Sequence, residues 1–297
     1  FQNSGTEATE ASIKIARKYF HKIGKPEKNR IITFQGAFHG RTLAALFAAN
    51  NQKHIEGFGP KVDGFDQVPF ADHEAIKKAI NKNTAAIMIE TIMGEGGIKV
   101  VPDFCIKGLR DICDEHGILL ILDEVQCAYR TGNFFAFEKS GIAPDIVPIA
   151  KGIGGGFPLG ACLVNKKVSV GMTPGTHGST FGGNPLSCSI GMGVLDVIFE
   201  KDFFKKVKQK GEYFHNGLKK IQDKYPKIIE EIRGVGLIKG LKMLVDNDEF
   251  IKKLMNNKML TVKASENVIR LFPPLVAKNE ELDESFEKIE KVCKETS

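Results

Sequence analysis

Short runs of consecutive apolar residues alternate with amphipathic stretches through the first two thirds of the chain. The runs at 85–89, 119–122 and 145–150 have few polar interruptions, which predicts strands buried on both faces, as in a parallel sheet. Residues 30–34 predict one more strand. Apolar positions at steps of three and four predict a helix over 8–23. Helices are also expected over 72–81 and 103–115, and the mostly apolar segment 185–199 predicts a further one. Strands alternating with helices indicate an α/β fold.

Several polar and glycine residues predict where these helices begin and end. Ser4 or Thr6 can cap the first helix, and Asp72 can cap the helix that follows it. Gly117 suits the position just after a helix C-terminus, where a left-handed backbone conformation is common.

The last third of the chain has a different pattern. Lys- and Glu-rich helical stretches alternate with short strands expected at 235–244 and 267–272. We therefore expect two domains, a large domain over 1–199 and a small α+β domain over 200–297.

Composition excludes several classes of function. The 297 residues are 42% hydrophobic and 26% charged, which is ordinary for a globular protein. The net charge of +6 is spread over Lys-rich helices and forms no basic stripe, which disfavours a nucleic-acid partner. No apolar run approaches the roughly 18 residues of a membrane span, and we expect no signal peptide. The six cysteines form no C-x-x-C pair or zinc spacing, which predicts reduced thiols, no metal site and a cytoplasmic location.

The strongest candidate chemistry lies at the ends of two predicted strands. The run 119–122 ends at Asp123, and the run 145–150 ends at Lys151, which a glycine-rich segment follows. Open α/β sheets bind ligands at the carboxyl ends of their strands. An amine that bonds to an aldehyde and a carboxylate that keeps a pyridine nitrogen protonated are what a pyridoxal 5′-phosphate (PLP) site requires.

Two motifs carry a resemblance to a known family. Asp-Glu-Val-Gln from Asp123 and Ala-Lys-Gly-Ile-Gly-Gly-Gly-Phe-Pro around Lys151 resemble the class III PLP-dependent aminotransferases, and the similarity extends over essentially the whole chain in the family's motif order. This resemblance implies the PLP-dependent transferase type I fold (aspartate aminotransferase-like). That fold has a mostly parallel, seven-stranded-type sheet sandwiched by helices, followed by a smaller α+β C-terminal domain.

The resemblance also implies roles in cofactor binding. Lys151 would carry the cofactor, Asp123 would hold its ring nitrogen and Phe38 would stack on the ring. Other cofactor contacts would come from seven residues of the same chain and, in a homodimer, one residue of the second subunit. The seven are Ser4, Gly5, Thr6, His39, Glu90, Gln126 and Val125, the last against the second ring face. Thr180 would reach the phosphate bound by the partner subunit.

Within the family the chain is most similar to enzymes that transaminate N-acetylornithine with 2-oxoglutarate, in arginine biosynthesis. Arg41 and Arg270 are then candidates for the carboxylates of the donor and of the acceptor. Glu95 would pair with Arg270, and Ser179 is a further candidate substrate contact.

The chain departs from the family pattern at several points. Thr9 stands where Asn is usual, and Thr91 and Met93 alter the turn after the strand that ends at Glu90. The segment 127–130 is one residue shorter than in relatives and lacks their glycines, so Tyr129 could crowd the site entrance. Because the chain opens inside the cofactor-binding domain, we expect that about 100 residues precede Phe1 in a full-length protein.

Other readings remain open on the sequence alone. The same class includes 4-aminobutyrate and ornithine aminotransferases, and a truncated paralogue could be catalytically silent. A nucleotide-binding loop is disfavoured, because Lys151 precedes the glycines and no G-x-G-x-x-G opens a helix.

Overall fold

The computed structural model describes residues 1–296, which form two compact units. The first unit comprises 1–91, 101–128 and 137–197, and the described part of the second comprises 92–100, 129–136 and 198–296. The division into domains at residue 199 stays a prediction.

The first unit is built on a six-stranded sheet in the order β2-β1-β3-β6-β7-β8. Every neighbouring pair is parallel except β7 and β8, which are antiparallel. The predicted mostly parallel sheet flanked by helices is confirmed, with six strands in the described residues. The strands are β1 (Arg30–Phe34), β2 (Phe65–Val68), β3 (Thr84–Glu90), β6 (Leu119–Asp123), β7 (Ile146–Ile149) and β8 (Ala161–Val164).

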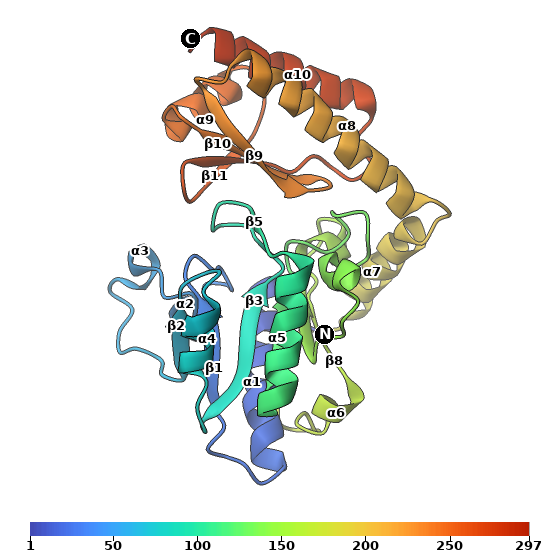
Figure 1. Cartoon of the computed structure of the whole chain (residues 1–297). Helices are drawn as coiled ribbons and strands as arrows, with labels where there is room; N and C mark the ends of the chain where they lie inside the picture. Colours follow the sequence, from blue (N-terminus) through green and yellow to red (C-terminus); the bar gives the residue numbers. More distant parts are fainter. Residues whose placement is uncertain (297) are drawn as a thin grey trace. The chain divides into compact units, whose positions relative to one another are not determined.

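The central strands are buried on both faces, as their unbroken apolar sequence requires. All seven residues of β3 and all five of β6 are buried. Helix α1 (Gly5–Lys22) packs on the sheet through a core that includes Ile15, Met88 and Ile121. Helix α5 (Asp103–His116) also packs on β3 and β6, and Figure 1 shows it in front of the sheet with α1 behind.

Further helical segments lie wholly or mainly in this unit. They are α2 (Leu43–Ala49), α3 (Gln52–Ile55), α4 (His73–Ala79), α6 (Lys166–Ser169), α7 (Pro185–Ile198) and the 3₁₀ segments Ala136–Ser140 and Lys151–Gly154. The predicted caps are present. Ser4 and Asp72 accept backbone N–H bonds at the starts of α1 and α4, and Gly117 ends α5 in the left-handed conformation at φ 58°.

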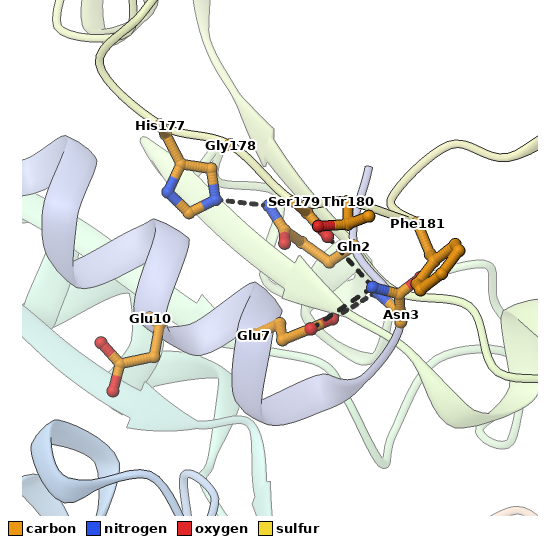
Figure 2. A pocket seen from close by; sticks show the side chains of 9 residues that line it. All are labelled: Gln2, Asn3, Glu7, Glu10, His177, Gly178, Ser179, Thr180 and Phe181. Atoms are coloured by element: carbon orange, nitrogen blue, oxygen red, sulfur yellow. Dashed lines mark hydrogen bonds between the residues drawn. The ribbon is translucent and has the colours of Figure 1, made fainter.

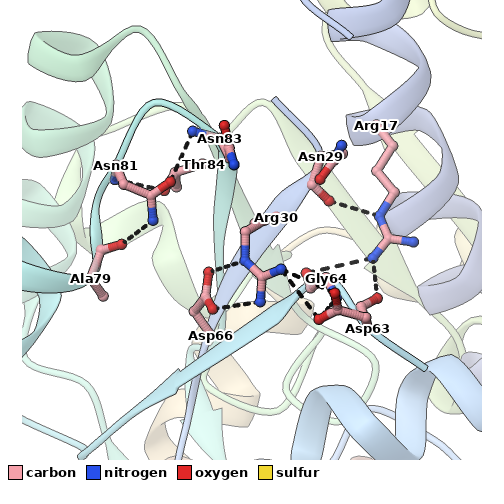
Figure 3. A network of polar contacts seen from close by, with 10 residues as sticks. All are labelled: Arg17, Asn29, Arg30, Asp63, Gly64, Asp66, Ala79, Asn81, Asn83 and Thr84. Carbon is pink, nitrogen blue, oxygen red and sulfur yellow. Dashed lines mark hydrogen bonds and ion pairs between the residues drawn. The ribbon is translucent and has the colours of Figure 1, made fainter. Parts of the chain in front are cut away.

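An arginine network joins the starts of β1 and β2 (Figure 3). The Arg30 guanidinium donates two bonds to the carboxylate of Asp66, at 2.7 and 2.8 Å, and reaches Asp63 at 3.2 Å. Arg17 of α1 donates to the carbonyl oxygens of Asn29 and Asp63. Since β1 and β2 pair in parallel from Ile31 opposite Phe65, this network fixes their register where the pairing begins.

The second unit is an α+β structure. Its four-stranded antiparallel sheet has the order β11-β12-β10-β9, and β4 and β5 form a separate two-stranded pair. Helices α8, α9 and α10 bury Phe214, Leu254 and Ile289 in one core with the sheet residue Leu241. The elements are β4 (Ile92–Met93), β5 (Lys99–Val100), α8 (Phe203–Lys224), β9 (Ile229–Val235), β10 (Ile238–Met243), α9 (Asn247–Asn256), β11 (Val262–Ala264), β12 (Val268–Leu271) and α10 (Asn279–Lys294).

One strand prediction in this unit was wrong in its first residues. The sequence predicted a strand over 235–244, but Val235 ends β9 and β10 begins only at Ile238. Gly236 turns the chain between them at φ 56°, and a Cβ there would lie 2.2 Å from the carbonyl oxygen of Arg130. Only glycine tolerates both the conformation and this close approach.

Candidate active site

Three polar side chains lie at the carboxyl ends of neighbouring parallel strands. The register of β3 and β6 places Glu90 opposite Asp123. Strand β7 is the next neighbour of β6, and Lys151 begins the 3₁₀ segment that follows it. This edge of a parallel sheet is where α/β proteins bind ligands.

Asp123 is bonded to His39. The Nδ1 atom of His39 lies 2.8 Å from Oδ2 of Asp123, and the backbone N–H of Val125 donates to Oδ1 at 3.0 Å. The two side chains are 4% and 0% exposed, for Asp123 and His39 respectively. Burial, the largest influence, opposes protonation of His39, but the hydrogen bond and charge of Asp123, with the charge of Glu90, outweigh burial and raise the pKa of His39.

Glu90 holds the segment that carries Phe38. Its Oε1 accepts the backbone N–H of Phe38 at 2.9 Å. Phe38 is half-buried, and the guanidinium carbon of Arg41 lies 5.6 Å from the centre of its ring. The buried carboxylate of Glu90 therefore fixes the backbone of the segment that carries Phe38 and Arg41.

The start of α1 contacts two of these segments. A Cβ on Gly5 would lie 2.5 Å from a methyl carbon of Val125, so only glycine allows this approach. The Thr6 hydroxyl accepts the backbone N–H of Arg41 at 3.2 Å. The first N–H groups of a helix have no partner within the helix, and Gly5 and Thr6 are the first residues of α1 after the capping Ser4.

An open pocket of about 400 Å³ lies where residues 176–181 run past the start of α1 (Figure 2). Asn3 donates to the Ser179 hydroxyl at 3.0 Å, and Gln2 and His177 are bonded at 2.8 Å. Thr180 is exposed and lines the pocket. Its other lining residues include Glu7, Glu10 and Phe181, as Figure 2 shows.

Glu95 and Arg270 lie in the second unit, and the ion pair expected between them is present. Arg270 Nη1 donates to Glu95 Oε1 at 2.7 Å. The Arg270 side chain is only 10% exposed, whereas that of Glu95 is 39% exposed. Arg270 Nε is buried with no hydrogen-bond partner among the described residues.

The chain matches the family model "Aminotransferase class-III" over residues 1–293. It is 54% identical to the acetylornithine aminotransferase of Agrobacterium fabrum and 53% identical to that of Mesorhizobium japonicum, covering 98% and 97% of this chain and 73% of each relative. Its fold matches the crystal structure of the ornithine aminotransferase from Toxoplasma gondii ME49 with a TM-score of 0.93 at 32% identity, covering 99% of this chain and 72% of that one.

The chain belongs to the class III aminotransferases.

Class III aminotransferases depend on PLP, and the residues at the sheet edge fit this cofactor. Oε1 of Gln126 is buried and has no hydrogen-bond partner among the described residues. A carboxylate offers about four lone-pair sites, so Asp123 can accept a further bond beside those from His39 and Val125. The edge therefore presents two buried acceptors, one charged and one neutral, for a protonated ring nitrogen and a ring hydroxyl.

Lys151 has a backbone conformation that is unusual for its residue type. It is exposed and has a φ of 50°, in the left-handed region where glycine is common. Strain of this kind recurs at functional sites, and here it falls on the residue expected to carry the cofactor.

The sequence indicated that Tyr129 could crowd the site entrance, whereas in the structure this residue is buried. Its side chain is 2% exposed and packs edge-to-face on Phe134 within the second unit, with the ring centres 4.9 Å apart. Burial raises the pKa of its hydroxyl to about 12. Tyr129 is therefore a packed core residue.

His54 was missed by the sequence reasoning. Its Nε2 lies 3.4 Å from Nη2 of Arg41, and its ring meets Phe38 edge-on at 6.4 Å. It lies in α3, a four-residue helix without motif or periodicity, so no local signal in the sequence marked it.

None of the described helices combines the length and apolar character needed to cross a membrane.

Proposed function

We propose that this aminotransferase transfers the amino group of N-acetylornithine to 2-oxoglutarate, giving N-acetylglutamate semialdehyde and glutamate, in arginine biosynthesis. The observation that carries the chemistry is the buried Asp123 carboxylate at the end of β6, with Lys151 following the neighbouring strand β7. The substrate rests on relatives at 45–54% identity that are named acetylornithine aminotransferases.

PLP, when bound, supplies an aldehyde that bonds to amines and a ring that withdraws electrons from the reacting carbon. Asp123 would hold the ring nitrogen and keep it protonated, because a buried carboxylate stabilises a positive charge beside it. His39, bonded to Asp123, holds that carboxylate in place. The Lys151 amine would hold the cofactor covalently and would serve as the general base and acid for the proton at the reacting carbon of the substrate.

The remaining assignments follow the contacts around Asp123. Phe38 and Val125 would hold the two faces of the ring, and the buried Oε1 of Gln126 would accept a hydrogen bond from the ring hydroxyl. The phosphate would bind at the start of α1, near Ser4, Gly5 and Thr6. Backbone N–H groups and the helix dipole favour an anion at this position. Glu90 fixes the backbone of Phe38.

The two arginines serve different carboxylates. Arg41 takes the carboxylate of N-acetylornithine, whose reacting amine lies at the other end of the molecule, and Ser179 is a further candidate substrate contact. Arg270 takes the carboxylate of 2-oxoglutarate. While the donor is bound, Glu95 neutralises Arg270. Because Glu95 is the more exposed partner, it can move into water and leave the buried guanidinium to the acceptor.

The test is the Arg41→Ala variant of a full-length enzyme, assayed with N-acetylornithine, ornithine and 4-aminobutyrate as donors. A charge-assisted bond of about 1.5–3 kcal/mol corresponds to a rise in KM for N-acetylornithine of roughly tenfold to a hundredfold. 4-Aminobutyrate also has a carboxylate at the end opposite its reacting amine, so an amine without a carboxylate, such as 1-aminopentane, is the control, and its KM should change little. Equal effects on N-acetylornithine and this amine would contradict the role of Arg41 in carboxylate binding. A wild type that prefers 4-aminobutyrate or ornithine would favour those aminotransferases, and no activity with any donor would favour a silent paralogue.

We further propose a homodimer in the cytoplasm. Thr180 is exposed beside the start of α1, where it is available to complete the phosphate site of a second subunit. All six cysteines are free, which suits a reducing compartment. Sedimentation at micromolar concentration should give a dimer, and Thr180→Ala should weaken PLP binding in it. Full PLP affinity in a monomer would contradict the shared site.

A further inference from the structure

Arg130 joins two ends of the small sheet in the second unit. Its Nη1 donates to the carbonyl oxygens of Leu237 at 3.3 Å and of Pro273 at 3.1 Å. Leu237 directly precedes β10, and Pro273 is the second residue after β12. The backbone of Arg130 adds a third contact, because its carbonyl accepts the N–H of Leu237 at 2.8 Å.

The backbone before Arg130 is strained and held by aromatic packing. Tyr129 has a φ of 70°, a conformation that costs a bulky residue free energy. The Tyr129 N–H donates to the carbonyl oxygen of Phe134, and the Tyr129 ring packs edge-to-face on Phe134. Phe134 in turn stacks on Phe199 with ring centres 5.6 Å apart. These contacts fix the direction in which Arg130 leaves the segment.

Arg130 and Arg270 share one aromatic ring. The guanidinium carbon of Arg130 lies 5.3 Å from the centre of the Phe272 ring, and that of Arg270 lies 6.0 Å from it. Arg270 and Phe272 are separated by one residue at the end of β12. A movement of Phe272 would therefore shift the ring on which the Arg270 guanidinium lies, and with it the backbone two residues beyond Arg270.

We propose that Arg130 is a positioning residue for Arg270. By tying Pro273 to Leu237 and lying on Phe272, Arg130 sets the orientation in which the Arg270 guanidinium meets the carboxylate of the keto-acid acceptor. This inference rests on the acceptor role proposed for Arg270. It makes Arg130 a determinant of the acceptor half of the reaction, with no role in binding the amino donor.

We expect substitutions of Arg130 to change the KM for the acceptor and to leave the KM for the amino donor nearly unchanged. In the PLP-loaded, full-length enzyme, Arg130→Met should raise the KM for 2-oxoglutarate by about tenfold and change the KM for the amino donor less than twofold. Arg130→Lys keeps the charge but loses the planar fork, so it should recover only part of the acceptor affinity. Calorimetric binding of glutarate, a dicarboxylate that cannot react, should weaken in the same order and gives a readout without turnover.

Lys210→Met is the matched control. Lys210 donates to the carbonyl oxygen of Leu275 at 2.8 Å, so its loss loosens the same chain segment without removing a contact of Phe272. The control should leave both KM values within twofold of the wild type. If Lys210→Met and Arg130→Met raise the acceptor KM equally, Arg130 is only structural and the inference is overturned.

A parallel Arg270→Ala variant separates this inference from the function on which it rests. If Arg270→Ala raises the acceptor KM and Arg130→Met does not, the positioning role fails and the proposed function stands. If Arg270→Ala has no effect on the acceptor KM, the acceptor role of Arg270 itself is wrong. Should Arg130→Met fail to fold, the same comparisons apply to Arg130→Lys.

Discussion

His39 Nδ1 lies 2.8 Å from Oδ2 of Asp123, and neither side chain has more than 4% of its surface exposed. A buried carboxylate with a hydrogen-bonded partner keeps a fixed orientation. In the proposed mechanism this carboxylate would hold the cofactor's ring nitrogen. His39 therefore holds the Asp123 carboxylate in place, as Glu90 holds the backbone of Phe38.

Asp123→Asn should cause a large loss of activity with little change in shape. The amide is nearly isosteric but has no charge with which to hold the ring nitrogen protonated. We expect kcat/KM to fall about 10³-fold or more, which is a loss of about 4 kcal/mol of transition-state stabilisation. Steady-state kinetics with saturating PLP measure this, and a fall below tenfold would rule out the role given to Asp123.

Lys151→Ala should abolish covalent attachment of the cofactor. Borohydride treatment followed by peptide mass spectrometry should find reduced PLP on Lys151 in the wild type and on no lysine in the variant. Turnover should be almost absent, because the general base is missing. Lys167, an exposed lysine of α6, provides a control: Lys167→Ala should retain both the labelled Lys151 peptide and normal turnover. Normal activity of Lys151→Ala would contradict the role proposed for Lys151.

The His39–Asp123 pair should make stability depend on pH. The pKa of His39 in the folded protein is raised above its ordinary value of 6.5, so the folded state binds the proton more tightly than the unfolded state does. The resulting stabilisation is fully present below pH 6.5 and is lost as the pH rises through the folded-state pKa.

Urea unfolding of wild type and His39→Asn over this range measures the effect. The difference between their free energies of unfolding should shrink as the pH rises above 6.5. His116→Asn, an exposed histidine at the end of α5, is the control and should show no such trend. A pH-independent difference for His39→Asn would mean that the pair contributes no proton-linked stability.

Lys239→Met should stabilise the second unit. Lys239 is 4% exposed on β10, and burial lowers its pKa to about 8. A shift from 10.5 to about 8 corresponds to a penalty near 3 kcal/mol at most. The bond from Lys239 Nζ to the carbonyl oxygen of Gly234, at 3.1 Å, offsets about 1 kcal/mol of this penalty.

The gain should therefore be about 1–2 kcal/mol at pH 7, where the buried lysine is protonated. It should decline between pH 8 and 10.5, because in that window the unfolded state binds more protons than the folded state. Denaturant unfolding at pH 7 and pH 10 measures this. Lys242→Met, on the same strand but ion-paired with Glu230 near the surface, should not stabilise. A destabilised Lys239→Met would show that the hydrogen bond outweighs the burial penalty.

The sequence by itself determined the elements whose signals are local. Unbroken apolar runs gave the buried strands β3 and β6, and single residues marked helix ends at Asp72 and Gly117. The sequence also predicted that Asp123 and Lys151 follow strands of one sheet, and parallel strands place their carboxyl ends at the same edge.

Only the tertiary structure decided which side chains meet across long stretches of chain. The bond between His39 and Asp123 and the approach of Arg130 to Phe272 depend on how loops leave the strands, and neither loop has a periodicity that records its path. Tyr129 shows the same limit: its φ of 70° is sustained by contacts with Phe134, which no propensity of tyrosine predicts. Local periodicity predicts the burial of a residue within its own element, whereas these pairings are set by the conformations of segments that are far apart in the sequence.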